Sequence, residues 1–153
     1  MSTSVIIRAT RTQLTGREPV PLEAVDGEAV QTIPLLGTVS AGQPLDIYEE
    51  ADELEVPAAW VRRKSFALRV RGGSMIDDDI LDGDIIIVEQ RTHAENGETV
   101  VARIHGDQAT LKRLYVEPDH VRLQPANEEM EPLRLGHEEI EVLGIVRMIV
   151  RQN

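Results

Sequence analysis

From Ile33 onward, short apolar stretches recur along the chain, most of them alternating with polar residues and separated by turn-forming residues. An alternation with a period of two is typical of half-buried β-strands. Dipeptides such as Asp82-Gly83 and Asn96-Gly97 mark the turns between these stretches. The pattern predicts strands at Ile33–Val39, Ser65–Arg71, Asp84–Glu89, Thr99–Ile104, Gln108–Tyr115, His120–Gln124 and Glu141–Arg151.

The pattern leaves little room for helices. Only Pro57–Val61 and the residues after Ser74 favour a helical turn. We therefore expect a mainly β fold, a compact and strongly bent β-sheet domain with one or two short helical turns. Residues 1–32 show no sustained period and contain Gly16 and Pro19-Val-Pro21, which predicts a flexible arm or linker ahead of a folded domain at 33–153.

Composition narrows the class of protein. A chain of 153 residues is long enough for one domain with a real core. Its longest apolar run, Ile85–Val88, is far shorter than the roughly 20 residues that span a membrane. Val5–Ile7 is too short for a secretory signal. The absence of cysteine excludes disulfides and thiolate chemistry and is compatible with the cytoplasmic location that we expect.

The net charge of −11 argues against the chain as a whole being a DNA-binding surface. Residues 1–17 contain three arginines and no acidic residue, a pattern that we interpret as a solvated linker. A helix-turn-helix needs several helices, and the residues before Ile33 are too few and too irregular for that. We expect no DNA-reading module in this chain.

Ser74 is the first candidate for chemistry. The glycines Gly72 and Gly73 before it would let backbone approach a substrate and present amide groups to a developing oxyanion. A serine hydroxyl is a weak nucleophile until a base removes its proton. Taken alone, the same residues favour a tight turn in which Ser74 caps a short helix.

Lys112 is the candidate base, because the four histidines lie in no motif that pairs them with a serine. Its neighbours Ala109, Leu111 and Leu114 are apolar, and desolvation on a buried strand would lower a lysine pKa from about 10.4 towards neutrality. Thr110 falls on the same strand face and could orient the amine. The alternative for Lys112 is an ordinary surface lysine on an edge strand.

Two further patterns bear on the chemistry. Val39-Ser40-Ala41-Gly42 follows the first strand, and its small residues would let an extended segment enter a narrow site, although a flexible connection fits as well. The aspartates after Asp78 resemble a calcium loop, but Ile80 occupies a ligand position and a strand follows where a helix should begin. The histidines lack metal-ligand spacing, so we expect neither a metal nor another cofactor.

These elements occur in an order and at spacings that resemble the LexA repressor family of self-cleaving serine–lysine proteins. The resemblance covers the chain from about Ile33 to its end. The matching residues are Ile33-Pro-Leu-Leu-Gly-Thr-Val-Ser-Ala-Gly-Gln-Pro44, Ser74-Met75 with Asp82-Gly-Asp84, Asn96-Gly97 with Val100-Val-Ala-Arg103, Lys112-Arg113 and Gly144-Ile-Val146.

The resemblance implies a role for each part. Ser74 would be the nucleophile and Lys112 the general base, with Met75 and Thr110 in support. The backbone amides near Gly73 and Ser74 would form the oxyanion hole. The scissile bond would join Ala41 to Gly42, and Val39-Ser40 would belong to the loop that carries it into the site; Ser40 replaces an alanine that is common at this position.

Partners follow from the same resemblance. The family fold is a bent β domain of the signal-peptidase type, which dimerises largely through its C-terminal strand, here about Glu141–Val150. Cleavage in the family is stimulated by the RecA–single-stranded DNA filament in the SOS response, and it ends repression.

The front of the chain departs from the family, whose members carry a winged helix-turn-helix. The chain is therefore either a LexA regulatory domain or a short relative like UmuD, which serves a translesion polymerase after cleavage. Ala41-Gly42 and the Ile33–Gly37 stretch favour LexA. A non-catalytic acidic dimerisation module and a signal-peptidase-like enzyme that cleaves other chains are the rival interpretations.

Overall fold

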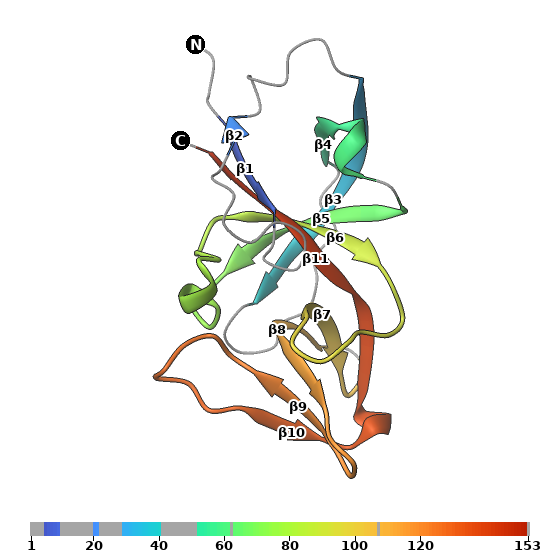
Figure 1. The fold of residues 1–153 in the computed structure, drawn as a ribbon, viewed down its shortest axis with the longest axis vertical. Helices are drawn as coiled ribbons and strands as arrows, with labels where there is room; N and C mark the ends of the chain where they lie inside the picture. Colours follow the sequence, from blue (N-terminus) through green and yellow to red (C-terminus); the bar gives the residue numbers. More distant parts are fainter. Residues whose placement is uncertain are drawn as a thin grey trace.

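A computed structural model describes the backbone of residues 5–9, 20–21, 29–40, 52–61, 63–106 and 108–152. Side chains are described for 29–39, 52–61, 63–106 and 108–151. Within these residues the fold is mainly β, as the sequence predicts, and the strands form one mixed sheet (Figure 1). The described part contains no helix long and apolar enough to cross a membrane.

Seven of the eleven described strands lie where the alternation predicts them. The strands are β1 (Val5–Ala9), β2 (Val20–Pro21), β3 (Val30–Ser40), β4 (Asp52–Pro57), β5 (Ser65–Arg71), β6 (Ile85–Gln90), β7 (Thr99–Ile104), β8 (Gln108–Val116), β9 (Val121–Gln124), β10 (Leu133–Leu135) and β11 (Ile140–Gln152). Short 3₁₀ turns are η2 (Ala58–Trp60), η3 (Ile76–Asp78) and η4 (His137–Glu139). β5 and β7 have the predicted bounds, η2 and η3 lie where the sequence favours helical turns, and the alternation does not predict β1, β2, β4, β10 or η4.

The sheet runs in the order β10-β9-β8-β3-β5-β6-β11-β1-β2, with β4 on β3 and β7 between β8 and β11. β11 is the long strand that joins the two ends of the molecule (Figure 1). Its register shifts between Val142 and Gly144 and again between Val146 and Met148, which lets one strand bend across both ends. At Gly144 an added Cβ would lie 2.5 Å from the Glu89 carbonyl oxygen, so only glycine fits where β11 crosses β6.

The core consists almost entirely of aliphatic side chains, as the scarcity of aromatic residues requires. Val39, Leu68, Met75 and Leu111 belong to one buried cluster that joins β3, β5, β8 and the residue before η3. Among the described residues, the buried polar or charged side chains are Ser74, Asp84, Thr110 and Lys112. Burying such groups is unfavourable unless they are paired, so their positions point to the functional site.

Candidate active site

Ser74 lies in the turn that connects β5 to η3. Gly72 has a φ of 95°, a conformation that glycine adopts without strain, and its amide donates to Asp82 Oδ1 at 2.8 Å. The chain then passes through Ser74 and Met75, whose side chains are fully buried. Met75 is the residue immediately before η3, and no side chain caps this turn. The capping role that the local sequence favours for Ser74 is therefore wrong.

The Ser74 hydroxyl faces β8 instead. Ser74 Oγ lies 3.1 Å from Lys112 Nζ and 3.5 Å from the carbonyl oxygen of Leu111, to which it donates. The side chains of Ser74 and Lys112 come from segments far apart in the sequence and meet inside the protein. As an ammonium group Lys112 donates to Ser74 Oγ, and as a neutral amine it can accept the serine proton.

Lys112 is only 3% exposed, which excludes the surface-lysine alternative. Strand alternation brings Thr110 to the same face, and Lys112 Nζ donates to Thr110 Oγ1 at 3.1 Å. Burial of the charged form lowers the pKa of Lys112 to about 8. A substantial fraction of the side chain is then a neutral amine at mildly alkaline pH, which is the state that a general base requires.

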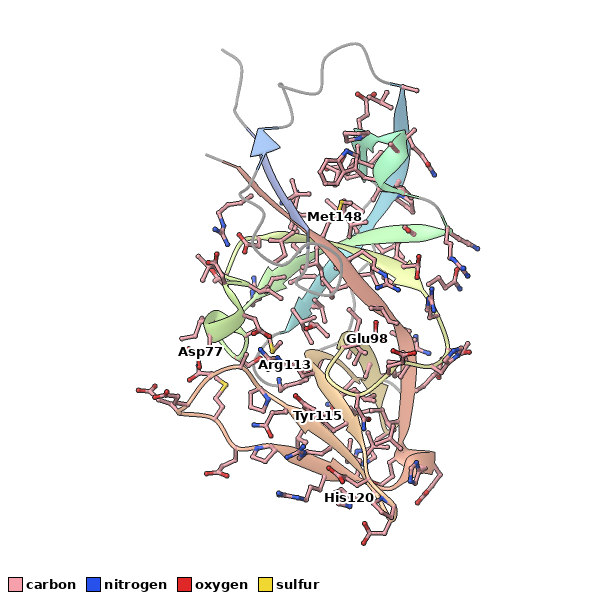
Figure 2. All side chains as sticks on the ribbon, in the orientation of Figure 1. Asp77, Glu98, Arg113, Tyr115, His120 and Met148 are labelled. Carbon is pink, nitrogen blue, oxygen red and sulfur yellow. The ribbon has the colours of Figure 1, made fainter. Side chains whose placement is uncertain are left out.

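Ion pairs fasten the turn around Ser74 to the rest of the sheet. Arg113, the residue after Lys112, donates from Nε to Asp78 Oδ2 at 2.7 Å and from a terminal nitrogen to Asp78 Oδ1. This hydrogen-bonded carboxylate raises the pKa of Arg113, which stays charged. Figure 2 labels Arg113 and also Asp77, the neighbour of Asp78 in η3.

A second ion pair lies at the base of the same turn. The buried carboxylate of Asp84 accepts two hydrogen bonds from Arg151 of β11, each 2.8 Å long, and one from the amide of Leu81. The Asp82-Gly83-Asp84 motif thus closes the loop after η3, with Gly83 at a φ of 90°. Sequence reasoning found the motif and Arg113 but not the ion pairs of Arg113 and Arg151, and it missed Asn127, which donates to the Gly73 carbonyl oxygen at 2.8 Å.

The segment expected to be cut begins at the end of β3. Val39 is fully buried, and Ser40 is the last residue of the strand. Ala41 and Gly42 lie outside the described residues. Ser40 pairs with Arg71 of β5 on one side and with Thr110 of β8 on the other. The end of β3 therefore lies between the strand that leads to Ser74 and the strand that carries Lys112.

The acidic residues near Ser74 serve the fold. The carboxylates of Asp78, Asp82 and Asp84 each accept hydrogen bonds from protein donors, as described above. In the part of the chain that the structure describes, no group of three or more histidine and acidic side chains has the arrangement of a metal site. The chemistry that the described residues support is that of a serine beside a lysine.

A buried serine hydroxyl beside a lysine amine is the arrangement of nucleophile and base found in serine–lysine hydrolases. Residues 34–147 match the family model described as Peptidase S24-like. Curated relatives are named LexA repressor: one from Syntrophobacter fumaroxidans is 42% identical over 78% of this chain, and one from Clostridium tetani is 48% identical over 75% of it. One from Caldicellulosiruptor saccharolyticus is 42% identical over 88% of the chain and 69% of its own length.

The chain therefore belongs to the peptidase S24-like family and, within it, to the LexA repressor family. It spans 58% and 60% of the lengths of the Syntrophobacter and Clostridium relatives. The match to the family model includes β3 from Pro34 onward, the turn that carries Ser74, and β8 with Lys112.

Proposed function

We propose that this chain is the regulatory part of a LexA-type repressor of the SOS response and that it cleaves its own Ala41–Gly42 bond. In this proposal Ser74 is the nucleophile and Lys112 the general base. Residues 33–153 form the autoproteolytic and dimerisation domain, and residues 1–32 form its arm or linker. Cleavage inactivates transcriptional repression by separating the two sides of the bond.

The observation that carries this proposal is the place where β3 ends. Ser40 is paired in parallel with Thr110, and Lys112 lies two residues further along β8 in the same direction. A chain that continues past Ser40 in this direction passes Lys112, with the turn that holds Ser74 on its other side. This direction supports the proposal that the Ala41–Gly42 bond meets the hydroxyl of Ser74.

The chemistry follows from the two side chains. The neutral amine of Lys112 takes the proton of Ser74 Oγ as this oxygen bonds to the carbonyl carbon of Ala41. The oxyanion accepts hydrogen bonds from the backbone amides of Gly73 and Ser74. The Lys112 ammonium then protonates the amide nitrogen of Gly42 as the carbon–nitrogen bond breaks. Water attacks the resulting ester, returns Ser74 to its hydroxyl form and leaves Ala41 with a free carboxylate.

Regulation is set by how often the segment occupies the site, because enzyme and substrate are one chain. We propose the RecA–single-stranded DNA filament as the activator, which would bind the docked conformation more tightly than the undocked one. Such a partner raises the rate without adding a catalytic group. RecA with single-stranded DNA and a non-hydrolysable ATP analogue should therefore increase cleavage at neutral pH, and no increase would remove this partner from the proposal.

A homodimer through the C-terminal strand is part of the same proposal. In the single chain, residues 148–150 of β11 pair with β6 on one edge and with β1 on the other. Edge-to-edge pairing with a second copy along these residues would require β1 to leave. Deletion of residues 1–9 should then strengthen dimerisation in sedimentation equilibrium, and equal dissociation constants would exclude this edge as the interface.

The decisive test of the proposed function is direct. The purified chain is incubated at pH 9, and its products are identified by mass spectrometry beside those of Ser74→Ala. Fragments that end at Ala41 and begin at Gly42 are expected from the unaltered chain only. An unchanged mass, or the same cleavage in Ser74→Ala, would refute the proposal.

A further inference from the structure

The segment after β9 packs against the turn that carries the serine. Asn127 donates from Nδ2 to the Gly73 carbonyl oxygen at 2.8 Å. Its neighbour Ala126 accepts a hydrogen bond from the Asp77 amide at 2.7 Å and donates from its own amide to the sulfur of Met75 at 3.4 Å. The backbone on both sides of Ser74 is thus held by one short segment from another part of the sheet.

The contact with Gly73 fixes the peptide plane that ends at Ser74. In a trans peptide the carbonyl group and the following N–H point in opposite directions, and the described residues contain no cis peptide bond. A donor that holds the Gly73 carbonyl on one side therefore directs the Ser74 N–H to the other. Among the described residues no acceptor is paired with this N–H, although Ser74 is fully buried.

We propose that Asn127 is a positioning residue that orients the Gly73–Ser74 peptide, so that the Ser74 amide donates to the oxyanion of the reaction. The inference rests on the proposed function and deepens it. Asn127 does not touch the reacting atoms. It acts through the carbonyl of Gly73, at the opposite end of the same peptide group.

Two features suit Asn127 to this role. The orientation of its carboxamide is fixed by a second contact, because Oδ1 accepts a hydrogen bond from the Glu129 amide at 2.9 Å. Donation to the Gly73 carbonyl also polarises the peptide and strengthens the Ser74 N–H as a donor. The Ile76 amide also donates to this carbonyl, at a longer distance of 3.3 Å, so Asn127 supplies the closer of these two contacts.

Asn127 also shapes its own turn, and a test must separate the two roles. Asn127→Asp keeps an oxygen for the Glu129 amide but removes the donor to Gly73. Asn96→Asp is the matched control. Asn96 Oδ1 accepts from the Val116 amide at 2.7 Å in a different turn, so the same chemical change there preserves the contact.

The first measurement is the rate of self-cleavage from pH 6 to pH 10. Above the pKa of Lys112 the rate reaches a plateau, which reports the chemical step and not the charge of the base. Removal of an oxyanion donor slows reactions by roughly 10²–10³-fold, so loss of its positioning should lower the plateau by about 10- to 100-fold. Asn96→Asp should stay within about twofold of the unaltered chain.

A plateau in Asn127→Asp equal to that of the unaltered chain would overturn the inference. An equal plateau with a shifted midpoint would overturn it as well, because the new carboxylate would then act only on the charge of Lys112. Thermal unfolding of both variants identifies any loss of rate that comes from a loss of folded protein.

The second measurement leaves the cleavage segment out of the reaction. A fluorophosphonate forms a phosphorus–oxygen bond with Ser74 Oγ and releases fluoride, while Lys112 takes the proton. Its phosphoryl oxygen occupies the position of the oxyanion, so labelling of Asn127→Asp should slow by a factor similar to that of cleavage. Slow cleavage with unchanged labelling would overturn the inference, because Asn127 would then affect only how the cleavage segment enters the site.

The two proposals fail in different ways. If the unaltered chain does not cut itself but its labelling at Ser74 depends on Asn127, the proposed function fails and the positioning role stands. If the chain cuts itself through Ser74 but cleavage and labelling are unaffected in Asn127→Asp, only the positioning role fails.

Discussion

Ser74 and Lys112 lie 3.1 Å apart, yet the protein holds them by different means. Ser74 sits in a turn whose backbone is fixed by polar contacts from Asp82, Ala126 and Asn127. Lys112 sits in the middle of β8, where pairing with Val100 of β7 sets the register that turns its side chain towards Ser74. The position of Ser74 thus depends on hydrogen bonds to its turn, and the position of Lys112 depends on strand pairing.

The difference suits the chemistry of each group. A nucleophile has to be placed accurately, and directional hydrogen bonds restrict position best. A lysine base has to lose its charge near neutral pH, and a dry strand environment achieves this by disfavouring the ammonium form. The polar turn and the apolar strand thus supply geometry and a lowered pKa, respectively.

The substitution with the largest expected effect tests the role of Lys112 on β8. Lys112→Arg keeps a positive charge but removes the proposed base, because arginine does not lose its proton in the accessible pH range. We expect self-cleavage at pH 9 to fall by more than about 10³-fold, the scale of losing an essential catalytic group. The rate of fragment formation measures it.

The chain contains one other lysine, Lys64, which is exposed and provides the matched control. Lys64→Arg should cleave at the original rate. Appreciable cleavage by a folded Lys112→Arg variant would show that another group takes the proton of Ser74.

The substitution with the next largest expected effect tests the turn that holds Ser74. Asp78→Asn weakens the ion pair with Arg113 that links η3 to β8, and it leaves the size of the side chain unchanged. The turn should then sample positions in which Ser74 is displaced from Lys112. We expect cleavage to slow by roughly tenfold, since small displacements of a reacting group reduce rates by factors of this order.

Asp77→Asn is the control for this prediction, because Asp77 is an exposed residue of the same η3 turn. It should behave like the unaltered chain. Equal rates for the two variants would mean that the contact between Asp78 and Arg113 does not contribute to the placement of Ser74.

The same contrast explains what the sequence could predict. Strands such as β5 and β7 were predicted with the observed bounds because alternation is a local property. β4 was missed although Leu54 and Val56 alternate with acidic residues, and three-residue β10 depends on its pairing with β9. β1 and β2 lie in the segment predicted to be a linker, and β1 is defined only by its pairing with β11 and β2.

The residues of the candidate site also differ in whether the sequence could predict them. Ser74 and Lys112 could be proposed because the order and spacing of their motifs resemble a known family, and strand alternation put Thr110 on the face of Lys112. Arg113, Asn127 and Arg151 could not, because their partners lie 35, 54 and 67 residues away in the sequence. Such contacts arise only from tertiary structure.

A smaller effect concerns stability. The pKa of Lys112 is about 8 in the folded protein and about 10.4 in an unfolded chain, so the unfolded state binds the proton more tightly. Lys112 therefore destabilises the fold below pH 8, and this penalty disappears as pH rises from 8 to above 10.4. Lys112→Met should increase the free energy of unfolding at pH 7 by about 2 kcal/mol, after allowance for the lost hydrogen bond to Thr110.

The comparison is made in the Ser74→Ala background, which keeps the chain intact, by urea unfolding between pH 7 and pH 10.5. The gain from Lys112→Met should shrink as pH rises, whereas exposed Lys64→Met should show no such trend. A gain that is independent of pH would mean that the effect comes from packing and not from desolvation of the amine.

The substitution with the smallest expected effect separates the contribution of hydrogen bonding to the pKa of Lys112 from that of desolvation. Thr110 Oγ1 accepts a hydrogen bond from Lys112 Nζ, which stabilises the ammonium form. Thr110→Val removes that acceptor with little change in shape, so the pKa of Lys112 should fall further below 8. We expect the midpoint of the pH profile of cleavage to move down by roughly half a unit, and the rate at pH 7 to rise about threefold.

Thr99→Val removes a hydroxyl group from the neighbouring strand β7, opposite Arg113, and serves as the control with an unchanged midpoint. The sign of the shift is informative, because a hydroxyl group that only holds the neutral amine in place would leave the midpoint unchanged and lower the plateau instead. A midpoint that rises in Thr110→Val would contradict the hydrogen-bond argument. A downward shift would show that desolvation lowers the pKa of Lys112 and that the hydrogen bond to Thr110 partly offsets this effect. An unchanged plateau would show that Thr110 does not contribute to the placement of the reacting atoms, which then depends on the turn that holds Ser74.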